Sequence, residues 1–186
     1  MHAKIITANN LKKVLAELKN ARERAMVLLS LKAGLRAVEI AYLKWGAVRE
    51  DDTVIELVST KGGKPRTVPV NKELREALQA YRAECKRTTG DGDLIFTARH
   101  AKPGEPLTPN AVAAWFRDLY TRRLRLTGYS SHSGRRTFAT QAARKATLVG
   151  ASLRDVQDML GHASLHTTQR YLEPSSDAKR KLVDLV

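Results

Sequence analysis

Residues 132–171 read HSGRRTFATQAARKATLVGASLRDVQDMLGHASLHTTQRY and carry the strongest structural signal in the chain. The segment opens on His132-Ser133-Gly134-Arg135, passes through Leu160-Gly161-His162 and ends on Tyr171, nine residues after the second histidine. Each pattern alone occurs by chance in many proteins. Their fixed order within one segment makes the combination informative.

Local signals within this segment predict helices. One helix begins near Ser133 and carries Arg135 on its first turn. Ser152 followed by Asp155 is typical of a capping box, and Gly161 suits the end of a helix, so a second helix is predicted over 152–160. A short third helix is expected to hold Tyr171.

Upstream, Gly34-Leu35-Arg36 is followed by Glu39. A helix from about Ala21 is expected to end at Gly34, which places Arg36 in a bend before a short helix. Further along, segments 53–58 and 66–70 are rich in β-branched residues and flank a glycine-containing turn with Lys61, which predicts a β-hairpin.

The remaining patterns complete a mainly α fold with a small antiparallel β-sheet, an α+β domain. Helices are expected after Thr7, from the cap Asn71 to about Lys86, and from Thr108-Pro109, where a cap precedes proline at the first helical position. Leu94–Phe96 is a possible third strand. Residues 176–186 are expected to form a final helix, and 144–150 make a long link between two helices.

The composition is typical of a single globular domain with a strong excess of positive charge. At 186 residues and 42% hydrophobic content, the chain suits one globular domain. Lysine and arginine number 33 against 19 acidic residues, a formal net charge of +14. This excess favours contact with nucleic acid, although charge alone also fits a ribosome-associated or merely soluble basic protein. The single Cys85 excludes an internal disulfide, and no apolar run is long enough to span a bilayer, so a cytoplasmic location is expected.

The motif residues have the chemistry needed to attack a phosphodiester. Arg36 and Arg135 offer paired, permanently charged donors to phosphate oxygens. His132 and His162 can donate hydrogen bonds to the same group, and His132 can accept the tyrosyl proton. Tyr171 is the expected nucleophile, and its pKa, ordinarily about 10, would fall beside these cations.

This ordered set resembles the catalytic domain of the tyrosine recombinases, also called the phage integrase family, from about Thr7 to Glu173. The resemblance implies that Lys61 is the general acid for the leaving 5′ oxygen, with Lys64 as its competitor. It also suggests Glu39 as a supporting carboxylate, against the alternative of an ordinary helix-face glutamate. DNA contacts are expected from three further basic residues: Lys64, Arg66 and Arg136.

The resemblance further implies no metal or nucleotide cofactor. His162 and His166 have the spacing of a zinc pair, but a third ligand and an adjacent glutamate are not apparent, so His166 is expected to be structural or exposed. Residues 1–174 would form the catalytic domain. Residues 175–186 would form a tail that docks on a neighbouring subunit, and the separate DNA-clamping domain of most members is expected to be absent.

The implied activity is site-specific recombination of double-stranded DNA through a 3′-phosphotyrosyl intermediate. The protein would be a homotetramer on DNA, a monomer when free, and would have no membrane partner. The sequence also fits two alternatives: a type IB topoisomerase that relaxes one duplex, and a DNA-binding relative without catalytic activity.

Overall fold

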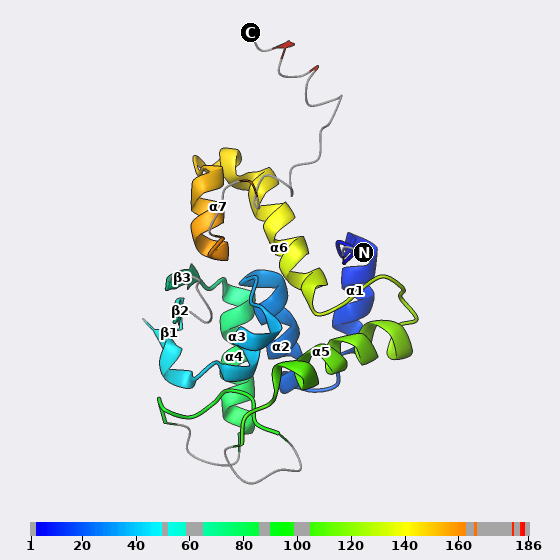
Figure 1. Cartoon of the computed structure of the whole chain (residues 1–186), viewed down its shortest axis with the longest axis vertical. Helices are drawn as coiled ribbons and strands as arrows, with labels where there is room; N and C mark the ends of the chain where they lie inside the picture. Colours follow the sequence, from blue (N-terminus) through cyan, green and yellow to red (C-terminus); the bar gives the residue numbers. More distant parts are fainter. Residues whose placement is uncertain are drawn as a thin grey trace.

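A computed structural model of the chain describes residues 3–49, 52–58, 65–85, 90–98, 105–162, 166, 180 and 183–184. The elements in chain order are α1 (Ala8–Glu17), α2 (Ala21–Lys32), α3 (Ala37–Tyr42), η1 (Trp45–Ala47), β1 (Val48–Arg49), β2 (Val54–Leu57), β3 (Arg66–Pro69), α4 (Lys72–Glu84), α5 (Pro109–Arg117), η2 (Asp118–Arg123), α6 (His132–Lys145), η3 (Ala146–Val149) and α7 (Leu153–Leu160). The predicted class, mainly helical with a small antiparallel sheet, is confirmed (Figure 1).

Local capping explains where the helices begin. A side-chain oxygen accepts a hydrogen bond from a backbone N–H of the first turn at the start of α1, α2, α4, α5 and α7, through Thr7, Asn20, Asn71, Thr108 and Ser152. These bonds satisfy donors that a helix start otherwise leaves unpaired. The helix starts predicted from the sequence at Thr7, Asn71, Thr108 and Ser152 are therefore confirmed.

The sheet has the strand order β1-β2-β3 and is antiparallel throughout. Strands β2 and β3 form the predicted hairpin, but the expected third strand at Leu94–Phe96 is wrong. Leu94 makes only an isolated bridge with Lys44, and the third strand is Val48–Arg49. Ile95 and Phe96 are apolar because they are buried in the core, and apolar content alone does not distinguish such a segment from a strand.

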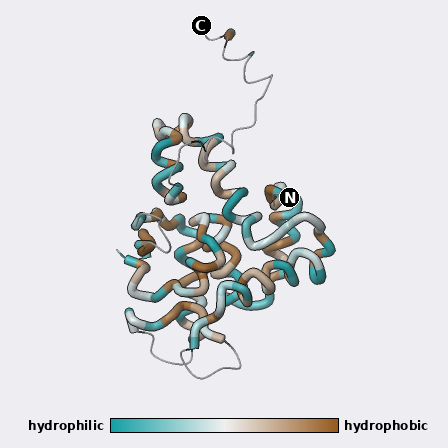
Figure 2. The backbone as a smooth tube through the Cα atoms, viewed as in Figure 1, coloured by the Kyte–Doolittle hydropathy of each residue, from teal (hydrophilic) through white to brown (hydrophobic). Residues whose placement is uncertain are grey.

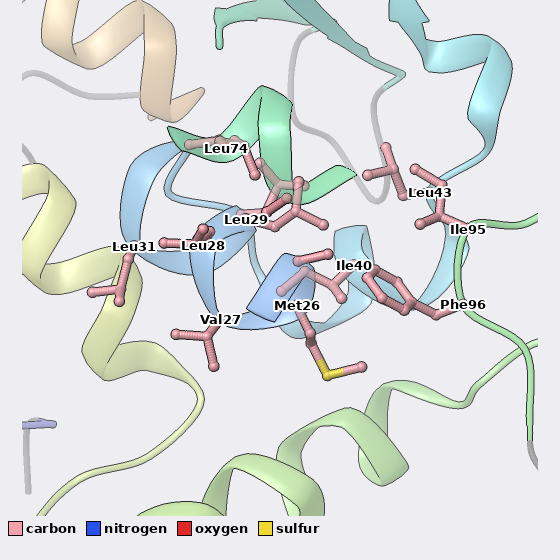
Figure 3. Close-up of a cluster of buried hydrophobic side chains, with 14 of the residues drawn as sticks. Met26, Val27, Leu28, Leu29, Leu31, Ile40, Leu43, Leu74, Ile95 and Phe96 are labelled. Carbon is pink, nitrogen blue, oxygen red and sulfur yellow. The ribbon is translucent and has the colours of Figure 1, made fainter. Parts of the chain in front are cut away.

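Helix α2 is the centre of the fold and packs against α4 and α6. Its residues 25–31 are all buried. Figure 3 shows Met26 of this helix near Ile40 and Phe96, which come from α3 and a later loop. The hydropathy colouring of Figure 2 follows the same pattern, with apolar residues concentrated in the interior of the helical body.

Helices α6 and α7 form a smaller unit beside this core (Figure 1). Helix α6 packs on α2, and α7 contacts both α6 and β3. The approach of α6 to α2 requires Gly134, because a Cβ there would lie 2.3 Å from the Ser30 Oγ. Alanines 139, 143 and 146 face Val156 and Leu160 in a separate apolar cluster.

The long link at 144–150 is a continuation of α6 followed by a tight turn. Ala146–Val149 form the 3₁₀ helix η3, which ends at Gly150 in the left-handed conformation with φ of 73°. No helix in the described part of the chain is both long and apolar enough to cross a membrane. The expected helices around Tyr171 and over 176–186 lie largely outside the described residues.

Candidate active site

Arg135 lies at the junction of three elements. It occupies the first turn of α6 and is only 5% exposed. Its Nη1 donates to the carbonyl of Gly34, just after α2, and its Nη2 donates to the carbonyl of Leu160, the last residue of α7, each at 2.6 Å. Because carbonyls at helix C-termini carry partial negative charge, a guanidinium is a suitable partner for them. Arg135 therefore brings the turn before Arg36 next to the turn that holds His162.

Arg36 is the N-cap residue of α3 and is held by Glu39. Its backbone N–H donates to Glu39 Oε2 at 2.7 Å, and its Nη1 donates to Oε1 at 3.0 Å. The expected contact between these two residues is present. The Arg36 side chain remains 36% exposed, so its guanidinium reaches the surface beside the buried Arg135.

Arg66 is turned toward the protein interior. Its Nη1 and Nη2 donate to the two Glu39 oxygens at 2.8 and 2.9 Å, and its Nε donates to the Met159 carbonyl at 2.9 Å. The side chain is only 8% exposed. The expected DNA contact of Arg66 stays a prediction, and this placement gives no support for it. Arg66 lies two residues before the buried Val68 in β3, so the pleat of the strand directs both side chains to the inner face.

Two arginines therefore surround one buried carboxylate. Burial by itself raises the pKa of Glu39, but hydrogen bonds and charge from Arg66 and Arg36 outweigh it and hold the pKa below its usual value. Glu39 is consequently ionised at neutral pH. This ion-pair cluster retains net positive charge, because a single carboxylate faces two guanidiniums.

His162 follows Gly161, which ends α7 in the left-handed conformation. The His162 N–H donates to the Gln157 carbonyl at 3.2 Å, and the Gln157 Nε2 donates back to the His162 carbonyl at 2.8 Å. Burial, followed by the charges of Arg135, Arg36 and Arg66, lowers the pKa of His162 to about 4. The imidazole is therefore neutral at pH 7, the form that carries one N–H donor and one acceptor nitrogen.

His132 and Arg136 lie on the first turn and a half of α6. His132 is exposed and three residues before Arg135, a spacing that places both on one side of the helix. Arg136 donates from Nη1 to the Ala3 carbonyl at 2.8 Å and so holds the N-terminal segment, a contact that sequence reasoning missed. Lys61, Lys64 and Tyr171 lie outside the described residues.

The structure thus brings together Arg36, Arg135 and His162, which are far apart in the sequence. The result is a positively charged, partly buried site whose donors are fixed by helix ends, and such a site suits a phosphate oxyanion. Among the described residues, no three His, Cys, Asp or Glu side chains cluster closely enough to hold a metal ion. His166 is exposed.

Known proteins are similar to this chain in sequence and in fold. The family model described as the phage integrase family matches residues 4–177. The chain is 28% identical over 181 residues to tyrosine recombinase XerA of Pyrococcus horikoshii, covering 97% of this chain and 60% of that protein. A crystal structure of XerA recombinase superposes with a TM-score of 0.80 at 26% identity, covering all of this chain and 65% of the other.

A crystal structure of the XerH site-specific recombinase bound to difH substrate has the same fold, with a TM-score of 0.73 at 23% identity. The match covers 97% of this chain and 53% of XerH. The chain therefore spans roughly half to two thirds of the length of these proteins.

Proposed function

The chain belongs to the phage integrase family, and from this premise we propose that it is a site-specific recombinase that cleaves and rejoins double-stranded DNA. The observation that carries the proposal is the double hydrogen bond of Arg135 to Gly34 and Leu160. This arrangement supports the proposal because it holds Arg36 and Arg135 near His162, and in the proposed reaction one phosphate contacts all three.

In the proposed reaction, the phenolic oxygen of Tyr171 attacks the scissile phosphorus. A bond forms between this oxygen and phosphorus while the bond from phosphorus to the 5′ oxygen breaks. Lys61 gives a proton to the departing 5′ oxygen, and His132 accepts the proton of the phenol. The DNA then remains attached through a 3′-phosphotyrosyl bond, until a 5′ hydroxyl of the partner duplex attacks that bond and releases the tyrosine.

Arg36, Arg135 and His162 would stabilise the charge that develops on the non-bridging oxygens. Guanidiniums remain charged throughout, and both are already oriented by the protein, so little reorganisation is needed at the moment of reaction. His162 would contribute a hydrogen bond from a neutral imidazole. These groups supply the positive charge that a divalent cation supplies in other phosphoryl-transfer sites, and the proposal includes no metal or nucleotide cofactor.

Double-stranded DNA is the proposed partner. The formal net charge of +14 and the complex of XerH with its difH substrate support this assignment. We further propose a monomer in the free state and a tetramer on DNA, with residues 175–186 docked on a neighbouring subunit, and action in the cytoplasm.

The nucleophile is tested by trapping covalent protein–DNA adducts. Duplexes selected for binding from a random pool are nicked near the bound site, so that the cleaved fragment diffuses away and the adduct accumulates. Tyr171→Phe is expected to abolish the adduct and leave DNA affinity nearly unchanged. Tyr42→Phe, at an exposed tyrosine of α3, is the matched control and should form the adduct normally.

Three other results would point to a different nucleophile or to a different function. An undiminished adduct with Tyr171→Phe would reject Tyr171 as nucleophile. Specific DNA binding with no adduct in the unaltered protein would identify an inactive binder. Relaxation of supercoiled plasmid without four-way junction products would identify a topoisomerase of type IB.

A further inference from the structure

Arg66 is bonded both to Glu39, which holds Arg36, and to the end of α7, which precedes His162. We propose that Arg66 is a positioning residue, which fixes Arg36 through Glu39 and fixes the turn carrying His162 through the Met159 carbonyl. This inference rests on the proposed function, because that function assigns Arg36 and His162 to the phosphate. Arg66 itself does not touch DNA in this proposal.

The first connection runs through Glu39. Oε1 accepts from Arg66 Nη1 at 2.8 Å and from Arg36 Nη1 at 3.0 Å. Oε2 accepts from Arg66 Nη2 at 2.9 Å and from the Arg36 backbone N–H at 2.7 Å. The paired bonds from Arg66 fix both the position and the plane of the carboxylate, as a guanidinium fork does. Arg36 is then oriented by a carboxylate that cannot rotate.

The second connection runs to the end of α7. The Met159 carbonyl lies in the last turn of this helix and accepts from Arg66 Nε at 2.9 Å. The side chain of Arg66 also lies against Gly161, where a Cβ would come within 2.9 Å of the Arg66 Cδ. Arg66 therefore caps the helix end and packs on the glycine that directly precedes His162.

The Arg66 side chain is far less exposed than those of two nearby arginines, Arg36 and Arg49. Its side chain is 8% exposed, against 36% for Arg36 and 54% for Arg49 in the same sheet. All three nitrogens of its guanidinium donate to protein acceptors. This geometry supports a role inside the protein.

Arg66 also begins β3, directly after the segment that contains Lys61. The proposed general acid therefore lies five residues before an arginine that is tied to Glu39 and Met159. Through this one side chain, β3 is joined to α3 and α7. Loss of the guanidinium would loosen all of these connections together.

Arg66→Met is the main test, because it keeps the aliphatic stem and removes the guanidinium. We expect single-turnover DNA cleavage to slow about 100-fold, the size of effect that a misplacement of about 1 Å produces. DNA affinity and its dependence on salt should stay unchanged. If Arg66 contacts phosphate, the slope of log K against log salt instead falls by about 1, and the proposal is overturned.

The matched control is Arg49→Met, which removes an exposed arginine paired with Glu56 at 3.6 Å in the same sheet. It should cleave at the unaltered rate. Arg66→Lys keeps the positive charge but cannot bond two carboxylate oxygens and a carbonyl together, so we expect cleavage about 10-fold slower than normal. Full activity of Arg66→Lys would show that charge alone suffices and would overturn the proposal, including where Arg66→Met does not fold.

A double-mutant cycle tests the route through Glu39. If Arg66 acts on Arg36 by way of Glu39, adding Glu39→Gln to Arg66→Met should slow cleavage much less than the product of the two separate effects. Strictly multiplicative effects would mean that the two residues act independently, and would contradict the proposed relay.

Hydrogen exchange tests the positioning without any need for DNA cleavage. The backbone amides of Arg36 and His162 should exchange about 10-fold faster in Arg66→Met, while amides of Val27 and Leu28 in α2 keep their protection. Unchanged exchange at both sites would overturn the proposal. If the unaltered protein forms no DNA adduct, the proposed function fails, yet this experiment still decides whether Arg66 positions the two residues.

Discussion

The guanidinium of Arg135 donates a hydrogen bond of 2.6 Å to the carbonyl of Gly34, 101 residues earlier in the chain. The same side chain also holds the carbonyl of Leu160 at the end of α7. Arg135 therefore supports the packing of α6 against two other helices and, in the proposed reaction, also binds the phosphate. These two roles have separate experimental consequences.

Arg135→Ala is expected to reduce both stability and activity. It leaves two buried carbonyls without a charged donor, which should lower the free energy of unfolding by about 2–4 kcal/mol, as measured by urea denaturation. Cleavage should fall by about 10³-fold or more even under conditions where the variant is folded, because a charged phosphate donor is lost.

The stability control for this prediction is Arg136→Ala, which removes a neighbouring arginine with a single hydrogen bond to Ala3. The free energy of unfolding of Arg136→Ala should fall by no more than about 1.5 kcal/mol. Equal destabilisation by the two variants would show that the contacts of Arg135 with Gly34 and Leu160 contribute little.

The lowered pKa of His162 predicts a loss of stability in mild acid. In the unfolded chain a histidine takes up its proton near pH 6.5, whereas in the folded protein the pKa of His162 is about 4. Between these values the unfolded state binds more protons, so stability falls as the pH falls from about 6.5 to 4, by at most about 1.4 kcal/mol per pH unit.

Urea denaturation of the unaltered protein and of His162→Gln at several pH values measures this contribution as a difference. The difference should change over the window from pH 6.5 to 4 and level off outside it. His132→Gln is the control, since that histidine is exposed. A titration of the His162 ring by NMR with a midpoint near 6.5 would contradict the electrostatic environment described for the site.

The sequence predicts most of the fold because its strongest signals are local. A cap acts within one helical turn, so the starts of α4 and α7 follow directly from Asn71 and Ser152. Gly34 and Gly161 mark helix ends for the same reason. The charges of the motif arginines Arg36 and Arg135 act on the second histidine, His162, in the structure. In the sequence, these residues are linked by a family resemblance and not by periodicity.

The arrangement of charges around the site was not predictable in the same way. Arg66 was one of three basic residues expected to contact DNA. Its actual partner, Glu39, lies 27 residues away in the sequence. The one indication in the sequence is the alternation of side chains along β3. Val68 is apolar and faces the core, so Arg66, two residues earlier, faces the same side.

Glu39→Gln is expected to be strongly destabilising. Breaking a buried ion pair by removing one partner costs about 3–5 kcal/mol, because the other charge stays buried. Glu56→Gln is the matched control, since Glu56 pairs with Arg49 at 3.6 Å with both side chains more than half exposed, and should cost less than about 1 kcal/mol.

Acid is expected to remove the extra stability that the unaltered protein has over Glu39→Gln. The folded pKa of Glu39 lies below its ordinary value, so its contribution to stability is complete above that ordinary value and disappears as the pH falls through the folded pKa. Denaturation of both proteins at pH 7 and pH 3 measures this. A gap in stability between the unaltered protein and Glu39→Gln that stays constant down to pH 3 would argue against an ionised, arginine-bound carboxylate.

Gly161 and Gly150 have nearly the same backbone conformation. Comparing an alanine substitution at each therefore separates the destabilisation caused by backbone strain from that caused by contact with Arg66. Gly161 has φ of 61° and Gly150 has φ of 73°, so alanine at either position pays the left-handed cost of about 1–2 kcal/mol. A Cβ at Gly150 meets nothing within 4 Å, whereas one at Gly161 lies 2.9 Å from the Arg66 Cδ.

Arg66 cannot simply move away from this Cβ, because its guanidinium is bound to Glu39 and Met159. Gly161→Ala should therefore be about 1 kcal/mol or more less stable than Gly150→Ala, as expected when overpacking is added to backbone strain. It should also slow DNA cleavage as Arg66→Met does, whereas Gly150→Ala should cleave at the normal rate. Equal stability and equal cleavage in the two alanine variants would show that Arg66 shifts freely, and that its contact with the turn before His162 does not order the site.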